Sequence, residues 1–94
     1  NEIINVGGYN VNPNEVEQAL MEIDGIRGAR VFAKKNSILG NIICAEVVSE
    51  SEKLDESSIR KHLSNRLQAF KIPRIIKFVE TLKSTNTGKL SRKP

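Results

Sequence analysis

The residues with the clearest chemical potential lie at the two ends of the chain. Lys89 follows Gly88 in a polar run that has neither helical nor strand periodicity. An ammonium group on a long side chain can stabilise the negative charge that rearranges around phosphorus in a cleft from which water is excluded. Near the other end stands the tripeptide Gly7-Gly8-Tyr9. Adjacent glycines permit a tight turn and let backbone approach a ligand closely.

The elements that must position these residues follow from the apolar pattern. Strands are predicted at residues 3–6 and 9–11, joined through the two glycines as a hairpin. A helix should follow, with Asn12 as its N-cap, Pro13 in its first turn and Glu15 completing a capping box. The spacing of Val16, Ala19, Leu20 and Ile23 predicts the apolar face of this helix. Gly25 is predicted to end it.

The remaining elements complete an α+β domain. Strands are predicted at residues 29–34, 42–48 and 75–79, with the second of them, apolar nearly throughout, in the centre. A second helix should begin at Asp55 and end before Pro73. Its buried stripe is predicted to comprise Ile59, Leu63, Leu67 and Phe70. The expected fold is a small domain with an N-terminal two-stranded hairpin and a three-stranded sheet covered by two helices.

Composition restricts the class of protein. Ninety-four residues form one small domain with a modest core and no deep substrate pocket. The single cysteine, Cys44, lies in an apolar run and is expected to be a buried free thiol, which favours a cytoplasmic location. The single histidine, His62, falls in a predicted helix and is expected to have a structural role. The sequence has no cluster of Cys and His residues that would predict a metal site. No apolar run approaches the length of a transmembrane segment.

The charge is divided unequally along the chain. Residues 1–59 carry five basic and ten acidic side chains, whereas residues 60–94 carry ten basic and one acidic. Such a basic segment suits an anionic partner, such as a nucleotide, a phosphorylated cofactor, a nucleic acid or an acidic protein face. For Arg60, Lys61 and Arg66, plain solvation of a helix is an equally good interpretation.

Two functions suggested by the basic residues are disfavoured. Nucleic-acid binding needs exposed aromatic side chains between Lys and Arg residues, but the chain has only four aromatics, three of them at predicted core positions. A phosphate-binding P-loop needs a glycine five residues before Gly88 and a Ser or Thr after Lys89. Lys83 and Leu90 occupy those positions, so the P-loop pattern fails.

Four blocks of the chain resemble the C-terminal domain of the adenylate-forming (AMP-binding) enzymes, which include acyl-CoA synthetases, peptide-synthetase adenylation domains and luciferases. The first block is the glycine-containing segment at residues 5–17. The others, in the family's order and spacing, are residues 67–73, 78–82 and 84–92. Together they span nearly the whole chain.

The resemblance implies a two-step ligase and assigns roles to the two ends. Lys89, supported by Gly88, matches the family's catalytic lysine for attack of a carboxylate on the α-phosphate of Mg-ATP. The Gly7-Gly8-Tyr9 loop matches the segment that lines the tunnel of the attacking thiol in the second step. Asn1 falls at the position of the family's hinge residue. The resemblance also implies that residues 1–94 form the mobile C-terminal domain of a larger enzyme.

The implied partners are the enzyme's own N-terminal domain, a carboxylic acid, ATP with Mg and coenzyme A, without nucleic acid or a transmembrane segment. The separate chain is expected to be inactive, because the ATP and acid pockets would lie on the absent domain. Coenzyme A is favoured as the thiol because acyl-CoA synthetases, including long-chain fatty-acid ligases, are the most populous class. Loading of a carrier protein, as in peptide synthetases, is the alternative, and an enzyme that stops at the adenylate is also open.

The chain departs from the family pattern at several positions. The proline usual before the last block is replaced by Lys83, and a common lysine of the first block is replaced by Asn5. Asn10 stands where some relatives place a basic residue near the coenzyme A phosphates. Phosphate contacts would then come from elsewhere. The candidates are Lys71, Arg74 and Lys77, although ordinary solvated charge explains each of them too.

Overall fold

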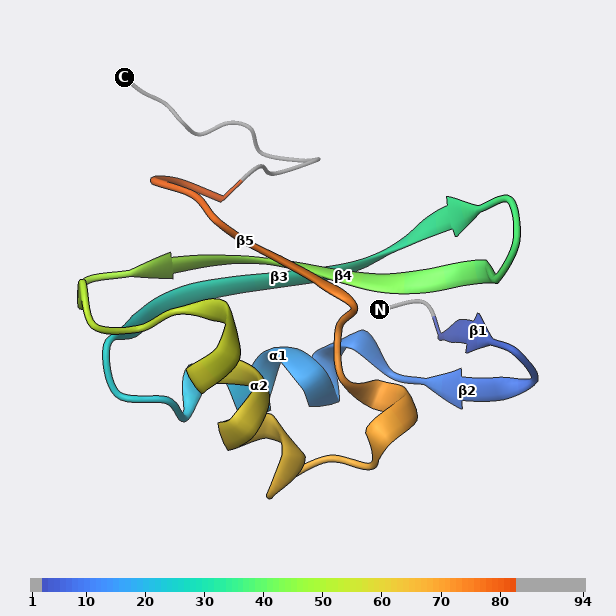
Figure 1. The fold of residues 1–94 in the computed structure, drawn as a ribbon, viewed down its shortest axis with the longest axis horizontal. Coiled ribbons are helices and arrows are strands. Elements are labelled where there is room, and N and C mark those ends of the chain that lie inside the picture. Colours follow the sequence, from blue (N-terminus) through green and yellow to red (C-terminus); the bar gives the residue numbers. More distant parts are fainter. Residues whose placement is uncertain (1–2, 83–94) are drawn as a thin grey trace.

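The structure, a computed structural model, describes residues 3–82 (Figure 1). The elements in chain order are β1 (Ile4–Val6), β2 (Tyr9–Val11), α1 (Pro13–Met21), β3 (Ile26–Asn36), β4 (Gly40–Ser49), α2 (Glu56–Ser64), the short 3₁₀ helix η1 (Ala69–Lys71) and β5 (Ile75–Phe78).

Two separate sheets confirm the predicted α+β class. Strands β1 and β2 form an antiparallel hairpin in which Val6 lies opposite Tyr9. In the second sheet the order is β3-β4-β5, with β4 in the centre as predicted. Strand β3 runs antiparallel to β4, and β5 runs parallel to it. Both α1 and α2 cover the same face of this sheet (Figure 1).

The helices begin where the sequence predicts. The Asn12 side chain accepts a hydrogen bond from the Asn14 N–H at 2.9 Å, and Pro13 opens α1. Asp55 forms a capping box with Ser58 at the start of α2. The predicted capping-box role of Glu15 is replaced by a tertiary contact, because its carboxylate binds another residue, as described below.

Both helices end earlier than predicted. Helix α1 is capped by Glu22, and Gly25 lies beyond it with a φ of +97°, in the turn into β3. Helix α2 is capped by Asn65. The predicted second stripe therefore holds only for Ile59 and Leu63, because the chain turns before the next apolar residues. Leu67 and Phe70 still pack against the core as half-buried side chains, but outside the helix.

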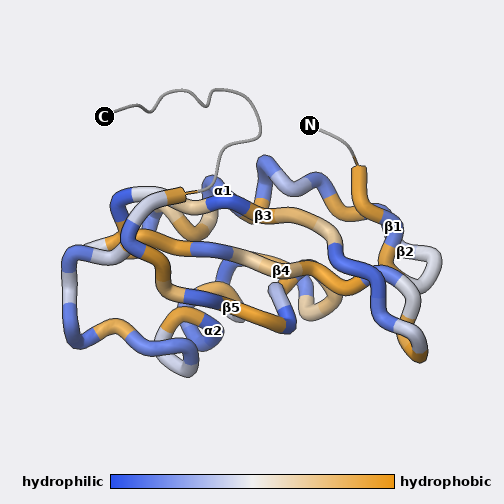
Figure 2. Tube along the Cα trace, turned by 90° about the horizontal axis from the view of Figure 1, so that it is seen from above, coloured by the Kyte–Doolittle hydropathy of each residue, from blue (hydrophilic) through white to orange (hydrophobic). Residues whose placement is uncertain are grey.

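The core lies between the helices and the inner face of the sheet. The apolar face of α1 is buried as predicted, and β4 contributes Ile43, Ala45 and Val47. Figure 2 shows β4 with hydrophobic colour over most of its length, whereas the connecting loops are mainly hydrophilic. Strand β3 is longer than expected, because its polar outer residues still form ladder bonds to β4.

The outer face of the sheet carries a partly buried ion pair. Glu46 on β4 is 8% exposed, and its Oε1 accepts a hydrogen bond from the Arg30 Nε at 3.1 Å. The Arg30 guanidinium also lies 4.1 Å from the centre of the Phe32 ring. Cys44 is a buried free thiol on β4, as predicted. Burial raises the pKa of this thiol, and nearby Lys34 and Lys77 partly oppose that rise.

The prediction of three core aromatics is only partly confirmed: Phe70 packs against the core, whereas Phe32 and Phe78 are not part of it. Phe32 and Phe70 are only half-buried, and Phe78 is 43% exposed. Tyr9 is 58% exposed. The pattern of the predicted strands placed Phe32 and Phe78 in the core, and helical spacing placed Phe70 there. Strands β3 and β5 lie at the edges of the sheet, where a side chain is covered from one side only.

Candidate functional site

The turn between β1 and β2 requires both of its glycines. Gly7 has a φ of +58° and Gly8 a φ of +93°, and both lie between the paired residues Val6 and Tyr9. Positive φ at both central positions is the type I′ geometry that fits the twist of a two-residue hairpin. A Cβ added at Gly8 would meet no atom within 4 Å. In the described part of the chain, glycine is therefore required here by backbone conformation and not by lack of space.

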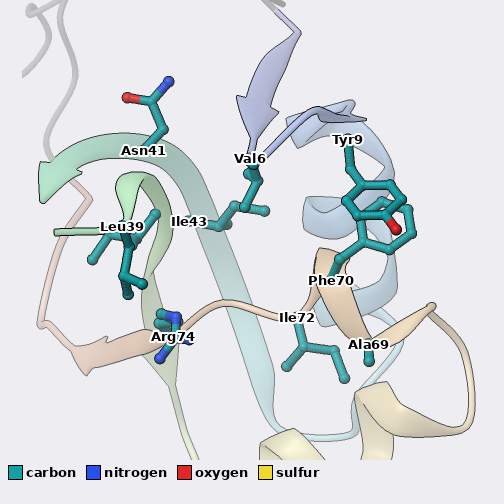
Figure 3. Close-up of a pocket in the computed structure, with 11 residues that line it drawn as sticks. Val6, Tyr9, Leu39, Asn41, Ile43, Ala69, Phe70, Ile72 and Arg74 are labelled. Carbon is teal, nitrogen blue, oxygen red and sulfur yellow. The ribbon is translucent and has the colours of Figure 1, made fainter.

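A cavity of about 390 Å³ lies beside this hairpin (Figure 3). Three parts of the fold meet around it: the hairpin, the start of β4 and the segment around η1. Its lining residues are Val6, Gly7, Tyr9, Leu39, Asn41, Ile42, Ile43, Ala69, Phe70, Ile72 and Arg74. The structure thus brings two residues of the predicted thiol-tunnel loop, Gly7 and Tyr9, to one cavity.

Two aromatic rings form one side of the cavity. The rings of Tyr9 and Phe70 are stacked, with centroids 4.5 Å apart and an angle of 22° between their planes. Figure 3 shows this pair across the cavity from Leu39 and Arg74. A cavity with stacked rings on one side and the Arg74 guanidinium on the other suits a ligand that has both a flat ring and anionic groups.

The three candidate phosphate-binding cations have different surroundings. The Lys71 Nζ binds the Glu15 carboxylate at 3.0 and 3.2 Å, so its charge is already compensated. Lys77 lies on β5 opposite Glu46, does not line the cavity and affects Cys44 on the outer face. Arg74 lines the cavity and has no acidic partner within 4.0 Å among residues 3–82. Arg74 is therefore the best placed of the three.

Ion pairs compensate part of the basic segment. Arg60 pairs with Glu56 at 2.9 Å, and Arg66 pairs with Glu22 at 2.8 Å. The Arg60–Glu56 pair lies on α2 and agrees with a solvated helical surface, whereas Arg66 lies beyond the end of α2 and contacts Glu22 at the end of α1. These pairs also connect the acidic segment, residues 1–59, with the basic segment, residues 60–94. The charge asymmetry of the sequence is therefore smaller on the folded surface.

Three of the predicted site residues lie outside the described residues: Asn1, Gly88 and Lys89. The last described residue, Leu82, lies over the start of β3. A Cβ added at Gly28 would lie 3.2 Å from the Leu82 Cδ1, so the absence of a side chain at Gly28 leaves the space that Leu82 uses.

Residues 3–82 contain no group of three or more His, Cys, Asp or Glu side chains that could hold a metal ion. Within the same residues, no helix is long and apolar enough to cross a membrane.

Comparison with known proteins defines the family. The model of the AMP-binding enzyme C-terminal domain matches residues 15–89, so the chain belongs to this family of adenylate-forming ligase domains. The chain is 35% identical over 92 residues to a 3,4-dihydroxybenzoate–[aryl-carrier protein] ligase of Bacillus anthracis, a match covering 98% of this chain and 22% of that protein. It is 39% identical over 87 residues to the 3-[(3aS,4S,7aS)-7a-methyl-1,5-dioxo-octahydro-1H-inden-4-yl]propanoyl:CoA ligase of Mycobacterium tuberculosis, covering 92% of this chain and 17% of the relative.

A solved structure agrees with the sequence relatives. The fold superimposes on a Mycobacterium tuberculosis fatty acyl CoA synthetase with a TM-score of 0.84 and 30% identity, over 93% of this chain and 17% of that one. The chain therefore spans only about a fifth of the length of its relatives, and the expected resemblance to the adenylate-forming enzymes is confirmed at the level of this domain.

Sequence reasoning missed most of the residues that line the cavity, among them Asn41 and Phe70. Asn41 and Phe70 come from separate parts of the chain, and Phe70 was assigned to a helical stripe. No local pattern could place either of them beside the hairpin, because the contact depends on how β4 and the segment after α2 meet in space.

Proposed function

We propose that this chain is the C-terminal domain of an ATP-dependent, AMP-forming acid–thiol ligase, most simply an acyl-CoA synthetase. A carboxylate oxygen would attack the α-phosphorus of Mg-ATP, forming an acyl-adenylate and releasing pyrophosphate. A thiol would then attack the acyl carbon, forming a thioester and releasing AMP and a proton. The observation that carries the proposal is the family match over residues 15–89, which ends at Lys89.

Lys89 is the proposed catalytic residue of the first step. Its ammonium group would contact the phosphate oxygens as charge rearranges around phosphorus, and loss of such a contact costs a factor of about 10² or more in rate. Gly88 would give the backbone next to it the freedom to bring the side chain into place.

The hairpin serves the second step in this proposal. Backbone at Gly7 and Gly8 would border the path of the thiol, and Tyr9 would lie at the adjacent cavity. Arg74 would bind phosphate oxygens of coenzyme A, because it is a cation at this cavity without an acidic partner among residues 3–82.

The two steps need different faces of the domain, so the domain would rotate about Asn1 between them. The ATP and acid pockets would belong to a larger N-terminal domain, and these 94 residues alone would be inactive. Magnesium would be bound there together with ATP. A cytoplasmic location and a role in fatty-acid metabolism are the simplest assignments for an enzyme of this kind.

The second candidate is an enzyme that loads a carrier protein. The similarity to the Bacillus anthracis 3,4-dihydroxybenzoate–[aryl-carrier protein] ligase favours this candidate, because the name of that relative gives a carrier protein as the acceptor. The two candidates differ in their acceptor, because coenzyme A carries the pantetheine arm on a free nucleotide whereas a carrier protein holds it on a folded domain.

The role of Arg74 provides a test of the acceptor. In the complete ligase, Arg74→Ala should raise the KM for coenzyme A about tenfold, because a charge-assisted hydrogen bond is lost. The KM for pantetheine, which lacks the nucleotide phosphates, should stay unchanged. Lys61→Ala removes an exposed cation from α2 and is the matched control. An equal loss with both thiols would contradict the phosphate contact, and thioester formation only with a holo carrier protein would favour the alternative.

A further inference from the structure

We propose that Asn5 and Asn41 are positioning residues that fix the Gly7–Gly8 turn for the thioester-forming step. The inference rests on the proposed function, in which this turn borders the path of the thiol. It assigns a role to two exposed or half-buried polar side chains, Asn5 and Asn41, through the bonds they make.

A chain of hydrogen bonds connects the three-stranded sheet to the turn. The Asn41 Nδ2, at the start of β4, donates to the backbone oxygen of Asn5 at 3.1 Å. The Asn5 Oδ1 in turn accepts from the Gly8 N–H at 3.1 Å. The Asn5 Nδ2 makes a longer contact of 3.4 Å to Asn10 Oδ1, its partner across the hairpin.

The turn has few other supports. The hairpin forms a sheet of its own, and an isolated two-stranded hairpin is marginally stable in water. Its base is anchored by the buried side chains Ile4 and Val11, but Gly7, Gly8 and Tyr9 are exposed. Val6 packs against the core and Tyr9 stacks on Phe70 of η1. The Asn41–Asn5 contact is the one side-chain hydrogen bond within residues 3–82 that joins this hairpin to β4.

The Gly8 amide has no backbone partner in the hairpin ladder, and the Asn5 side chain is its acceptor. In a two-residue turn with Val6 opposite Tyr9, the Gly8 N–H lies outside the strand ladder. The Asn5 side chain supplies an acceptor at that point, because its amide oxygen can accept a hydrogen bond. Asn5 therefore braces the turn.

The test measures both half-reactions in the complete ligase, with pantetheine as the thiol so that phosphate electrostatics do not contribute. Asn5→Ala and Asn41→Ala should each lower kcat for thioester formation from pre-made acyl-adenylate about threefold to tenfold. Carboxylate-dependent pyrophosphate–ATP exchange should stay within about twofold of wild type, the change expected when no bond is lost. Asn5→Asp keeps the acceptor for the Gly8 N–H and should retain the wild-type thioester rate.

The two residues act in series, so the double variant should be no slower than the slower single variant. Additive losses would show that Asn41 does not act through Asn5. A faster thioester step in Asn5→Ala would overturn the inference, because it would mean that the Gly8 N–H is better left free.

Two controls separate this inference from other causes. Asp55→Ala removes the α2 cap at a site unconnected with the hairpin. If this variant lost as much thioester formation as the asparagine variants, the loss would reflect lower stability of the domain and not positioning of the turn. If Gly8→Leu blocks thioester formation while the asparagine variants do not, only the positioning role fails. If none of these variants affects that step, the proposed function of the hairpin fails as well.

Discussion

At the scale of single residues, the turn conformation alone accounts for the glycine at position 8. Its φ of +93° demands glycine for the turn, yet a Cβ there would meet open space in this chain. Obstruction of a thiol path by a side chain at Gly8 thus depends on what faces the hairpin from the rest of the enzyme. A glycine pair in the sequence predicts the turn, but the sequence alone says nothing about the space around it.

Cys44 gives a prediction at the same scale. The thiol is 2% exposed, and burial raises its pKa, so both access and ionisation disfavour reaction. We expect a disulfide reagent to label the folded chain at least about tenfold more slowly than the chain unfolded in urea. Labelling followed by absorbance measures this directly, with Cys44→Ser as the blank because the chain has one cysteine. Equally fast labelling in the folded state would contradict the buried position.

At the scale of elements, the starts of helices were predictable and their ends were not. Asn12 and Asp55 carry side chains that cap the following N–H groups, which is a local effect visible in the sequence. The end of α2 depends on tertiary packing, since Leu67 and Phe70 continue the apolar spacing but contact the core from a segment outside the helix. The cavity at η1 escaped prediction for the same reason.

The α2 cap predicts an acid-sensitive contribution to stability. Hydrogen bonds from Ser58, first from its backbone N–H and then from its hydroxyl, lower the pKa of Asp55. A group whose pKa is lowered on folding stabilises the fold above its unfolded value, about 3.9, and loses that effect as pH falls through the folded pKa. Wild type should therefore have a higher Tm than Asp55→Ala near neutral pH, with the difference shrinking below about pH 4.

Thermal unfolding of the two proteins across pH checks this prediction. Ser58→Ala serves as a second variant, because it removes the hydroxyl while the backbone N–H bond to Asp55 remains. Its Tm at neutral pH should lie between those of wild type and Asp55→Ala. A Tm difference between wild type and Asp55→Ala that stays constant from neutral pH to pH 3 would rule out a contribution from the ionised carboxylate.

At the scale of the whole molecule, the account assigns alternating tasks to opposite ends of one domain. The order and type of the elements were predictable, because apolar periodicity and turn residues fix them locally. The substrate acid was not, since its pocket would lie in a different part of the ligase. The cavity beside the hairpin was not predictable either, because only the folded chain brings its three segments together.

The most direct measurement compares wild type, Lys89→Ala and Gly8→Leu in the complete ligase. Carboxylate-dependent pyrophosphate–ATP exchange reports the first step, and thioester formation from pre-made acyl-adenylate reports the second. Gly40→Leu is the matched control, because Gly40 has a φ of +83° and its added Cβ would also meet no atom within 4 Å. It should leave both half-reactions near wild type.

The account predicts that Lys89→Ala loses exchange by a factor of about 10² or more while keeping thioester formation, and that Gly8→Leu does the reverse. A result in which neither substitution affects either half-reaction would contradict it. Lys89 would then be a solvated charge and Gly8 only a turn residue.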